Sequence, residues 1–218
     1  MKLLAIDTSS SICAACVFET DTGTILAQES RDIGRGHAEI LMELIQNTLS
    51  ESQVTYQDLK RIGVTIGPGS FTGVRVGMTV ARGLGLSLNI PVVGISTLDA
   101  CIATARGFGH ESLLVSLLDA KRGELYCKLE GQEAFAASYE DIAKRIEGMN
   151  VGLCGSGASI LNEACQKNYI IIHENAASEI EIIAKISAKM PNPSSPPEPL
   201  YLRSADAKIQ TGFALERA

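Results

Sequence analysis

Two apolar runs separated by a short polar segment decide the fold: Leu3-Leu4-Ala5-Ile6-Asp7-Thr8-Ser9-Ser10-Ser11-Ile12-Cys13-Ala14-Ala15-Cys16-Val17-Phe18. The runs Leu3–Asp7 and Ile12–Phe18 have the length of strands, and the polar residues between them are typical of a turn. A third such run, Thr24–Ser30, follows the turn signal Asp21-Thr22-Gly23. The chain is therefore predicted to begin with three adjacent antiparallel strands.

After these strands the apolar residues take up helical spacing. From His37 onward, a helix is predicted by the recurrence of Ile40, Leu41, Leu44, Ile45 and Leu49. The next predicted elements are a strand over Arg61–Ile66, a helix over Gly73–Leu88 and a strand over Pro91–Ile95. Together these elements predict an N-terminal lobe over residues 1–97.

The second half of the chain repeats this plan in a shorter form. Strands are predicted over Leu113–Leu118, Glu124–Leu129, Val151–Cys154 and Tyr169–Ile172, and helices over Leu98–Ala105, Tyr139–Ile146, Ala158–Gln166 and Glu179–Lys189. Each half has a hairpin with an Asp near its turn and a later Gly-rich junction between a strand and a helix. We predict an α/β fold of two related lobes, the second reduced and covering residues 98–190. A tail, residues 191–218, follows, and because its first part holds five of the seven prolines it is not helical.

Composition places the chain among ordinary globular proteins. It has 218 residues, of which 45% are hydrophobic and 20% charged, so a disordered or fibrous chain is excluded. No apolar run is long enough to span a bilayer, and Asp7 interrupts the opening apolar run before a signal peptide forms, so a cytoplasmic protein is expected. With a net charge of -6 the chain is poorly suited to bind a polyanion alone, and a role on RNA would need a partner.

The cysteines and histidines give little sign of reactive chemistry. The six cysteines lie mostly in apolar stretches, and Cys13 and Cys16, three apart in a predicted strand, face opposite sides, which favours structural thiols. No two of the three histidines are spaced as a helical metal pair, and no nucleophile elbow of the G-x-S-x-G type is present. We therefore predict neither a metal site nor a catalytic residue.

Two polar segments could bind phosphate. Asp7-Thr8-Ser9 ends the first strand, where a carboxylate and hydroxyls can hold Mg²⁺ and phosphate oxygens, or can satisfy backbone donors at a turn. Gly67-Pro68-Gly69-Ser70-Phe71-Thr72-Gly73 precedes a helix, so its N–H groups could bind an anion, but a tight structural turn explains it equally well. The candidate cofactor residues are Asp7, Thr8, Ser9, Gly67 and Gly69.

The helix over Gly73–Leu88 has an unusual stripe of small residues. Gly77, Ala81 and Gly85 are four residues apart and leave a groove into which another element can press closely. That element is either the helix from His37 in the same chain or another subunit. Ala38 and Met42 widen the apolar arc of the His37 helix, which favours a second contact.

Three segments closely resemble the TsaB (YeaZ) family: Ile6–Ser9, the run Gly67–Arg75 and Leu118–Tyr126. The resemblance covers essentially the whole chain. It implies the actin-like ATPase (ribonuclease H-like) fold and the role of an accessory subunit in making threonylcarbamoyladenosine at position 37 of tRNAs reading ANN codons. In the catalytic relative TsaD, an HxxxH helix binds a metal, whereas here Leu41 stands four residues after His37, so the metal motif is missing.

The resemblance also implies partners. TsaD is expected to bind the two helices at His37–Leu49 and Gly73–Leu88, TsaE to supply an ATPase, and a homodimer to form through the same face when TsaD is absent. ATP or ADP with Mg²⁺ can lie at the subunit junction, and tRNA is contacted only indirectly. The predicted interface residues are His37, Leu41, Leu44, Ile45, Val74, Gly77, Met78, Ala81 and Gly85.

Three functions follow from these patterns. The favoured hypothesis is a non-catalytic scaffold that binds TsaD. The alternative is an ATP-dependent phosphotransferase or ATPase that uses Asp7, the loop Gly67–Gly73 and Gly155-Ser156-Gly157. A peptidase related to the glycoproteases is a distant third.

Overall fold

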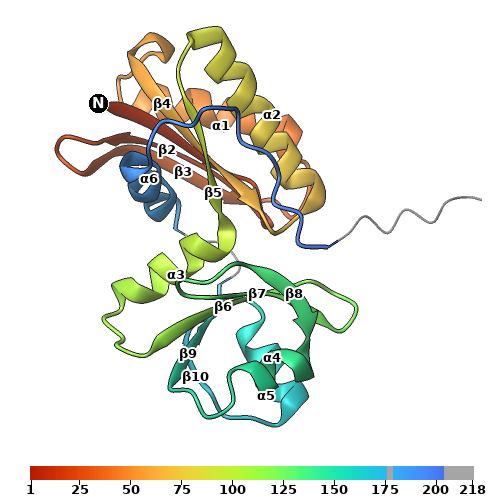
Figure 1. Ribbon diagram of the computed structural model, residues 1–218. Helices are drawn as coiled ribbons and strands as arrows, with labels where there is room; N and C mark the ends of the chain where they lie inside the picture. The colour runs from red at the N-terminus through yellow and green to blue at the C-terminus, as the bar shows by residue number, and fades with distance from the viewer. Residues whose placement is uncertain (176–178, 204–218) are drawn as a thin grey trace, which may run out of the picture.

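Two five-stranded sheets, each with helices against it, make up the molecule (Figure 1). The computed structural model describes residues 1–175 and 179–203, so the end of the predicted tail lies outside the described residues. The first sheet has the order β3-β2-β1-β4-β5. Its strands are β1 Lys2–Asp7, β2 Ile12–Glu19, β3 Thr24–Asp32, β4 Leu59–Gly67 and β5 Val92–Ser96. The predicted meander is confirmed, because β1, β2 and β3 pair antiparallel in sequence order.

The second sheet repeats the topology of the first. Its order is β10-β9-β6-β7-β8, with β6 paired antiparallel to β7 and parallel to β9, as β1 is to β2 and β4. The strands are β6 Leu113–Asp119, β7 Glu124–Leu129, β8 Phe135–Ser138, β9 Val151–Cys154 and β10 Ile170–His173. This repeated arrangement is the duplicated plan that the sequence predicts, and every strand of the second copy except β6 is shorter than its counterpart in the first. Strand β8 was not predicted.

Helices cover both faces of the first sheet. On one face lie α1 (His37–Glu51) and α2 (Phe71–Leu88), which form a core with Leu4 and Ile6 of β1. On the other face, α6 (Ile180–Lys189) packs on Leu3 and Ala5. Alternate residues of β1 therefore serve opposite cores, as the pleat of a strand requires. A short 3-10 helix, Tyr56–Asp58, precedes β4.

Helix α6 returns to the first sheet from the far end of the sequence. It lies in the range predicted for the second lobe, yet a Cβ on Gly63 of β4 would lie 1.9 Å from Oγ of Ser187 on α6. At the end of α6, the buried Arg61 donates from Nη1 to the carbonyls of Ser187 and Met190, at 2.7 and 2.6 Å. The lobe boundaries stay a prediction, and residues 180–190 pack on the first sheet.

The second lobe has a core of its own. The remaining helices are α3 (Thr97–Gly107), α4 (Tyr139–Arg145) and α5 (Ala158–Cys165). Buried residues of β6, β7 and β9 meet Ile142 of α4 and Leu161 of α5 in one hydrophobic cluster.

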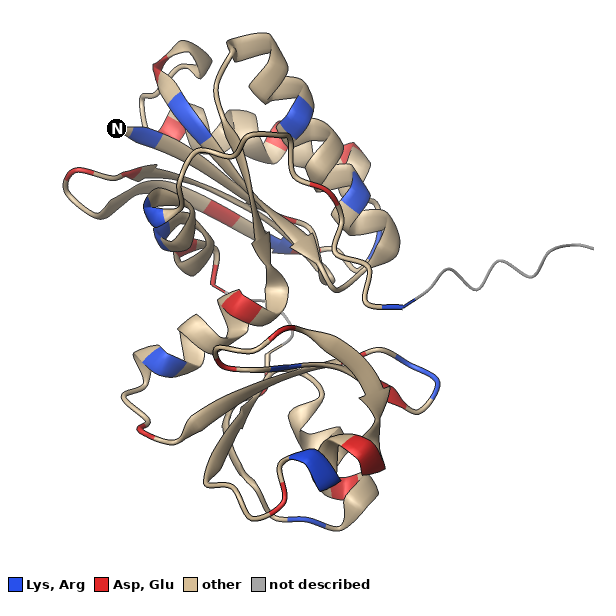
Figure 2. Ribbon diagram, viewed as in Figure 1, with Lys and Arg blue, Asp and Glu red and all other residues tan. Residues whose placement is uncertain are grey.

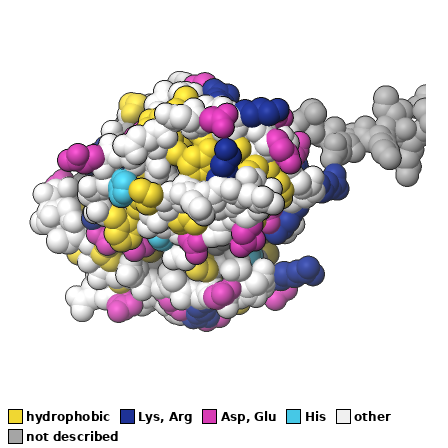
Figure 3. Space-filling view, turned by 90° about the horizontal axis from the view of Figure 1, so that it is seen from below, with side chains coloured by type: hydrophobic (Ala, Val, Ile, Leu, Met, Phe, Trp, Pro, Cys, Tyr) yellow, Lys and Arg dark blue, Asp and Glu magenta, His cyan; other side chains and the backbone are white. Residues whose placement is uncertain are grey.

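Figure 3 shows the molecule from below, where a hydrophobic patch is surrounded by side chains of both charges. No helix among residues 1–175 and 179–203 is long and apolar enough to cross a membrane.

The six thiols have the structural placement that was predicted. Five are buried, and only Cys165 is partly exposed. Burial raises the pKa of Cys13 to about 11 and those of Cys16 and Cys127 to about 12. Because the reagent must reach a thiolate, and five of the sulfur atoms are buried, we expect Ellman's reagent at about pH 8 to label Cys165 first and the buried five only after unfolding. Prompt labelling of several thiols in the native protein, followed by absorbance, would contradict this placement.

Candidate functional site

The carboxylate of Asp7 is buried and is held by three donors. Its Oδ1 accepts hydrogen bonds from the Ser9 N–H at 2.8 Å, the Ser9 hydroxyl at 2.7 Å and the Thr65 hydroxyl at 2.7 Å. The neighbouring Thr8 hydroxyl donates to the carbonyl of Gly73 at 2.7 Å. These polar groups thus fasten the end of β1 to β4 and to the start of α2. Of the two interpretations of Asp7-Thr8-Ser9, this geometry favours the turn that satisfies buried donors.

The glycines of the loop before α2 allow it to press on the same turn. The Ser70 N–H donates to the Ser9 carbonyl at 2.7 Å, and a Cβ on Gly69 would lie 2.2 Å from that carbonyl oxygen. Gly67 has φ of 92°, a left-handed conformation that suits glycine. Helix α2 begins at Phe71, two residues earlier than predicted, because Ser70 caps it by accepting from the Gly73 N–H at 3.1 Å. The structure brings all five candidate cofactor residues together, packed against one another, and their cofactor role stays a prediction.

Replacement of Asp7 tests whether its role is structural. In Asp7→Ala the Ser9 and Thr65 donors lose their buried acceptor, so the free energy of unfolding is expected to fall by about 2 kcal/mol. Asp7→Asn keeps Oδ1 and is expected to lose less. The measurement is urea unfolding followed by circular dichroism. Equal stability of Asp7→Ala and the wild type would show that these hydrogen bonds contribute nothing.

A cleft of about 820 Å³ lies between the two lobes. The first lobe lines it with the segment Ser9–Ile12 and with Ser70, and the second lobe with Leu118–Lys121 and Ser156. Burial raises the pKa of Asp119, but the hydrogen bonds that it accepts from Lys121 outweigh burial and hold its pKa below the ordinary value. Gly155, which precedes Ser156, packs tightly against β6, since a Cβ on it would lie 2.3 Å from the Leu117 carbonyl oxygen. The cleft therefore has polar walls from both lobes.

The small-residue stripe of α2 faces this chain's own sheet. A Cβ on Gly77 would lie 2.3 Å from the Thr8 hydroxyl, and one on Gly85 would lie 2.3 Å from Cγ2 of Val92 in β5. The predicted interface residues are buried in the first lobe: His37, Leu41, Leu44, Ile45, Val74, Gly77, Met78, Ala81 and Gly85. The prediction that they form an exposed docking surface is wrong, because β1, β4 and β5 already fill the groove.

The exposed side of α1 and α2 forms a second apolar face, which we call the α1/α2 face. A groove of about 350 Å³ between the helices is lined by Ala38, Phe71, Thr72, Arg75, Val76, Thr79 and Val80. Met42 is 45% exposed and Phe71 is 67% exposed. Of the residues of this face, only Ala38 and Met42 were predicted to make a second contact. The signal for the rest was a second apolar stripe on α2, Val76 and Val80, four residues apart and offset from the glycines.

The two helices of the α1/α2 face carry opposite charges (Figure 2). Helix α1 contains Glu39, Glu43 and Glu51 and no Lys or Arg, whereas α2 contains Arg75 and Arg82 and no Asp or Glu. Within the chain, Glu43 already pairs with Arg31 of β3, whose Nη1 lies 3.0 Å from Oε1 of Glu43. In the described part of the chain, no group of three or more His, Cys, Asp or Glu residues is placed to hold a metal ion.

Comparison with known proteins assigns the family. The family model described as TsaD, tRNA N6-adenosine threonylcarbamoyltransferase, matches residues 27–211. The TsaB protein of Bacillus subtilis is 36% identical over 129 residues, and that of Escherichia coli is 32% identical over 126 residues. The chain belongs to the TsaB (YeaZ) branch of the TsaD family. The resemblance seen in the sequence is thereby confirmed.

The extent of the match differs among the relatives. The alignments cover 59% of this chain and 55% of the Bacillus protein, and 58% and 53% for the Escherichia protein, so the chain spans about half the length of these curated relatives. An uncharacterized protein of Mycobacterium tuberculosis, Rv3421c, is 30% identical over 94% of this chain and 93% of its own length.

Solved structures of TsaB (YeaZ) type share the fold. YeaZ from Pseudomonas aeruginosa superposes with a TM-score of 0.71 and 25% identity, covering 85% of this chain and 89% of its own. A second Pseudomonas aeruginosa protein, described as uncharacterized with similarity to peptidase YEAZ, gives a TM-score of 0.72 and 22% identity, with 93% and 99% covered. These matches confirm the two-lobed fold.

Proposed function

We propose that this chain is a non-catalytic accessory subunit that binds TsaD through the α1/α2 face. In this role it supports, together with TsaE, the transfer of threonylcarbamoyl to adenosine 37 of tRNAs that read ANN codons. Family membership and the relatives described as tRNA threonylcarbamoyladenosine biosynthesis proteins support the pathway. The observation that carries the docking proposal is the exposed apolar groove between α1 and α2.

The partner is chosen by homology and charge. The TsaD family model matches residues 27–211, a range that contains α1 and α2, so a TsaD protein is expected to carry a corresponding helix pair. Two such pairs can meet about a pseudo-two-fold axis, with the acidic α1 of one opposite the basic α2 of the other. The same geometry accommodates a second copy of this chain when TsaD is absent.

The non-catalytic part of the proposal rests on two positions. Leu41, where the resemblance implies the second metal-binding histidine of TsaD, is fully buried in the hydrophobic core. Oδ1 of Asp7, the carboxylate that an ATPase would use, is occupied by Ser9 and Thr65. ATP turnover by the isolated chain that is lost in Asp7→Asn would favour the phosphotransferase alternative.

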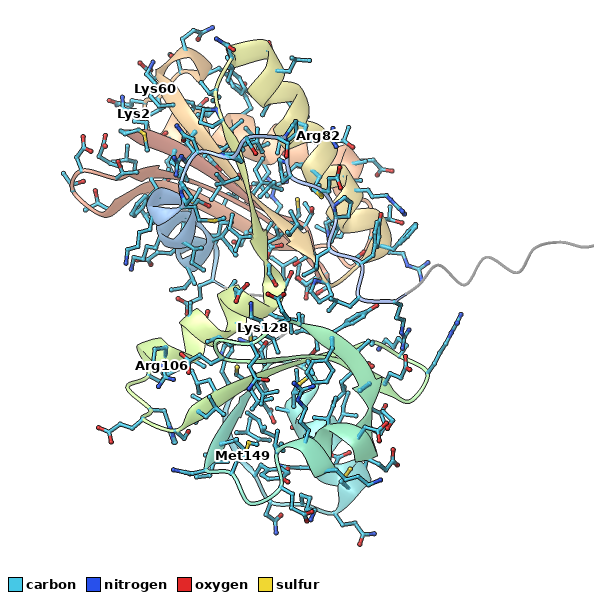
Figure 4. All side chains as sticks on the ribbon, viewed as in Figure 1. Lys2, Lys60, Arg82, Arg106, Lys128 and Met149 are labelled. Atoms are coloured by element: carbon cyan, nitrogen blue, oxygen red, sulfur yellow. The ribbon has the colours of Figure 1, made fainter. Side chains whose placement is uncertain are left out.

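A charge placed on the α1/α2 face tests the docking. In Met42→Glu, a carboxylate enters the apolar face beside the glutamates of α1, so the Kd for the TsaD protein of the same organism is expected to rise about tenfold or more. The matched control is Met149→Glu. Met149 is 46% exposed against 45% for Met42, and it lies in the second lobe (Figure 4).

Isothermal titration calorimetry provides the readout, and tRNA modification in a reconstituted mixture gives a second one. We expect Met149→Glu to bind TsaD as the wild type does. Equal loss in both variants, or no loss in either, would reject the α1/α2 face as the docking site. Absence of any binding by the wild type would reject the proposed function itself.

A further inference from the structure

The segment after α6 is held at both ends although it is not helical. At its start, Arg61 binds the carbonyls of Ser187 and Met190, as described above. Farther on, the Leu200 N–H donates to the Ile66 carbonyl of β4 at 2.9 Å. At its end, Nη1 of Arg203 donates to the Ala120 carbonyl in the second lobe at 2.9 Å. The segment therefore has a fixed path from the first sheet to the second lobe.

This path places Tyr201 beside the start of α2. The Tyr201 hydroxyl accepts a hydrogen bond from Nη2 of Arg75 at 2.7 Å, and Cζ of Arg75 lies 5.6 Å from the Tyr201 ring centroid. On its other side Arg75 stacks on Phe71, with Cζ 3.3 Å from the ring centroid. Although they are ordered by these contacts, the rings of Phe71 and Tyr201 are 67% and 56% exposed. We call these three residues the Arg75 stack.

The Arg75 stack is continuous with the α1/α2 face. Phe71 and Arg75 line the groove between α1 and α2, and the same two side chains line a pocket of about 410 Å³ that Tyr201 and Leu200 close from the other side. A protein seated on the α1/α2 face would thus reach the tail segment 199–203 without a break in the surface.

We infer that the Arg75 stack is a specificity-determining anchor for TsaD and that the tail segment 199–203 is part of the docking surface. This inference rests on the proposed function. Tyr and Arg are the residues that most often dominate binding energies, and side chains already held in place lose little conformational entropy on association. Arg75 has five N–H donors, so the one bond to Tyr201 leaves others for a partner carboxylate. The matching TsaD surface presents an acidic side chain flanked by apolar groups.

The test uses the full chain and TsaD of the same organism in titration calorimetry. Phe71→Ala and Tyr201→Ala are each expected to raise the Kd about tenfold or more, because each removes one ring of the stack. Arg75→Lys keeps the charge but loses the planar stacking, and is expected to weaken binding as well. The control is Phe108→Ala, since Phe108 is 63% exposed in the second lobe and should leave the Kd within about twofold.

The outcomes separate this inference from the function on which it rests. If the wild type binds TsaD and Met42→Glu weakens binding, but Tyr201→Ala and Phe71→Ala bind like the wild type, the inference is wrong and the docking proposal stands. If the wild type does not bind TsaD, both are wrong. The melting temperature of each variant is measured to show that it is folded. Tyr201→Phe keeps the ring and loses only the hydroxyl, so it is expected to bind TsaD more tightly than Tyr201→Ala does. Equal binding by these two variants would overturn the role of the ring.

Discussion

Replacing Gly73 by Ala is expected to lower the free energy of unfolding by about 3 kcal/mol, although only one methyl group is added. The new Cβ would lie 2.0 Å from the backbone oxygen of Thr8. That oxygen belongs to a turn fixed by Asp7 and Thr65, so it cannot rotate away as a side chain would. To make room for the methyl group, α2 would have to move away from the end of β1, and the close packing of these two elements would be lost.

The matched control lies in the same helix. Gly83 is also in α2, but nothing lies within 4 Å of the position that a Cβ would take there. Gly83→Ala is therefore expected to raise stability by up to about 1 kcal/mol, through helix propensity alone. Both variants are measured by urea unfolding with circular dichroism. Equal effects of the two substitutions, in sign and size, would refute the close approach of α2 to the β1 turn.

Arg61→Met is expected to cost about 3 kcal/mol in the free energy of unfolding. Methionine fills part of the same volume but removes the donors that satisfy the carbonyls of Ser187 and Met190 at the end of α6. A guanidinium at this position also suits the negative end of the helix dipole. Arg61 is only 7% exposed, so water does not replace these bonds without opening the structure.

The neighbouring Lys60 gives the comparison. It lies on β4 next to Arg61, is exposed, and is labelled in Figure 4. Lys60→Met is expected to change stability by no more than about 0.5 kcal/mol, as surface substitutions usually do. Guanidinium unfolding of both variants decides the matter. A loss in Arg61→Met no larger than in Lys60→Met would mean that the cap of α6 contributes little.

The sequence predicted the elements of the fold well because apolar periodicity reports burial directly. The antiparallel start, the repeated plan and both long helices are confirmed by the sheet order and the element bounds. Strand β8 was not predicted, because all four of its residues, Phe135–Ser138, are partly exposed and show no alternation between buried and exposed positions. Helix α6 was predicted, but the sheet against which it packs was not. That packing brings Ser187 of α6 close to Gly63 of β4, and no periodic pattern in the sequence links these two residues.

The docking residues show where sequence reasoning fails. Small and apolar residues occur on two sides of α2, and the sequence alone does not say which side meets the sheet. The glycines are buried because the helix approaches Thr8 closely, whereas Val76 and Val80 are left on the outer side. The Arg75 stack was missed for a different reason. It joins residues separated by 126 positions, and only the folded chain brings them together.

The return of α6 has a consequence for dissecting this molecule. A fragment ending at residue 97 would contain every strand of the first sheet but would leave Leu3, Ala5 and Val93 facing water, because Ile183 and Ala184 cover them from the far end of the sequence. We expect such a piece to aggregate and not to stand alone. The first lobe thus depends on a helix that the chain supplies only after the second lobe, whereas the second lobe keeps a hydrophobic cluster of its own.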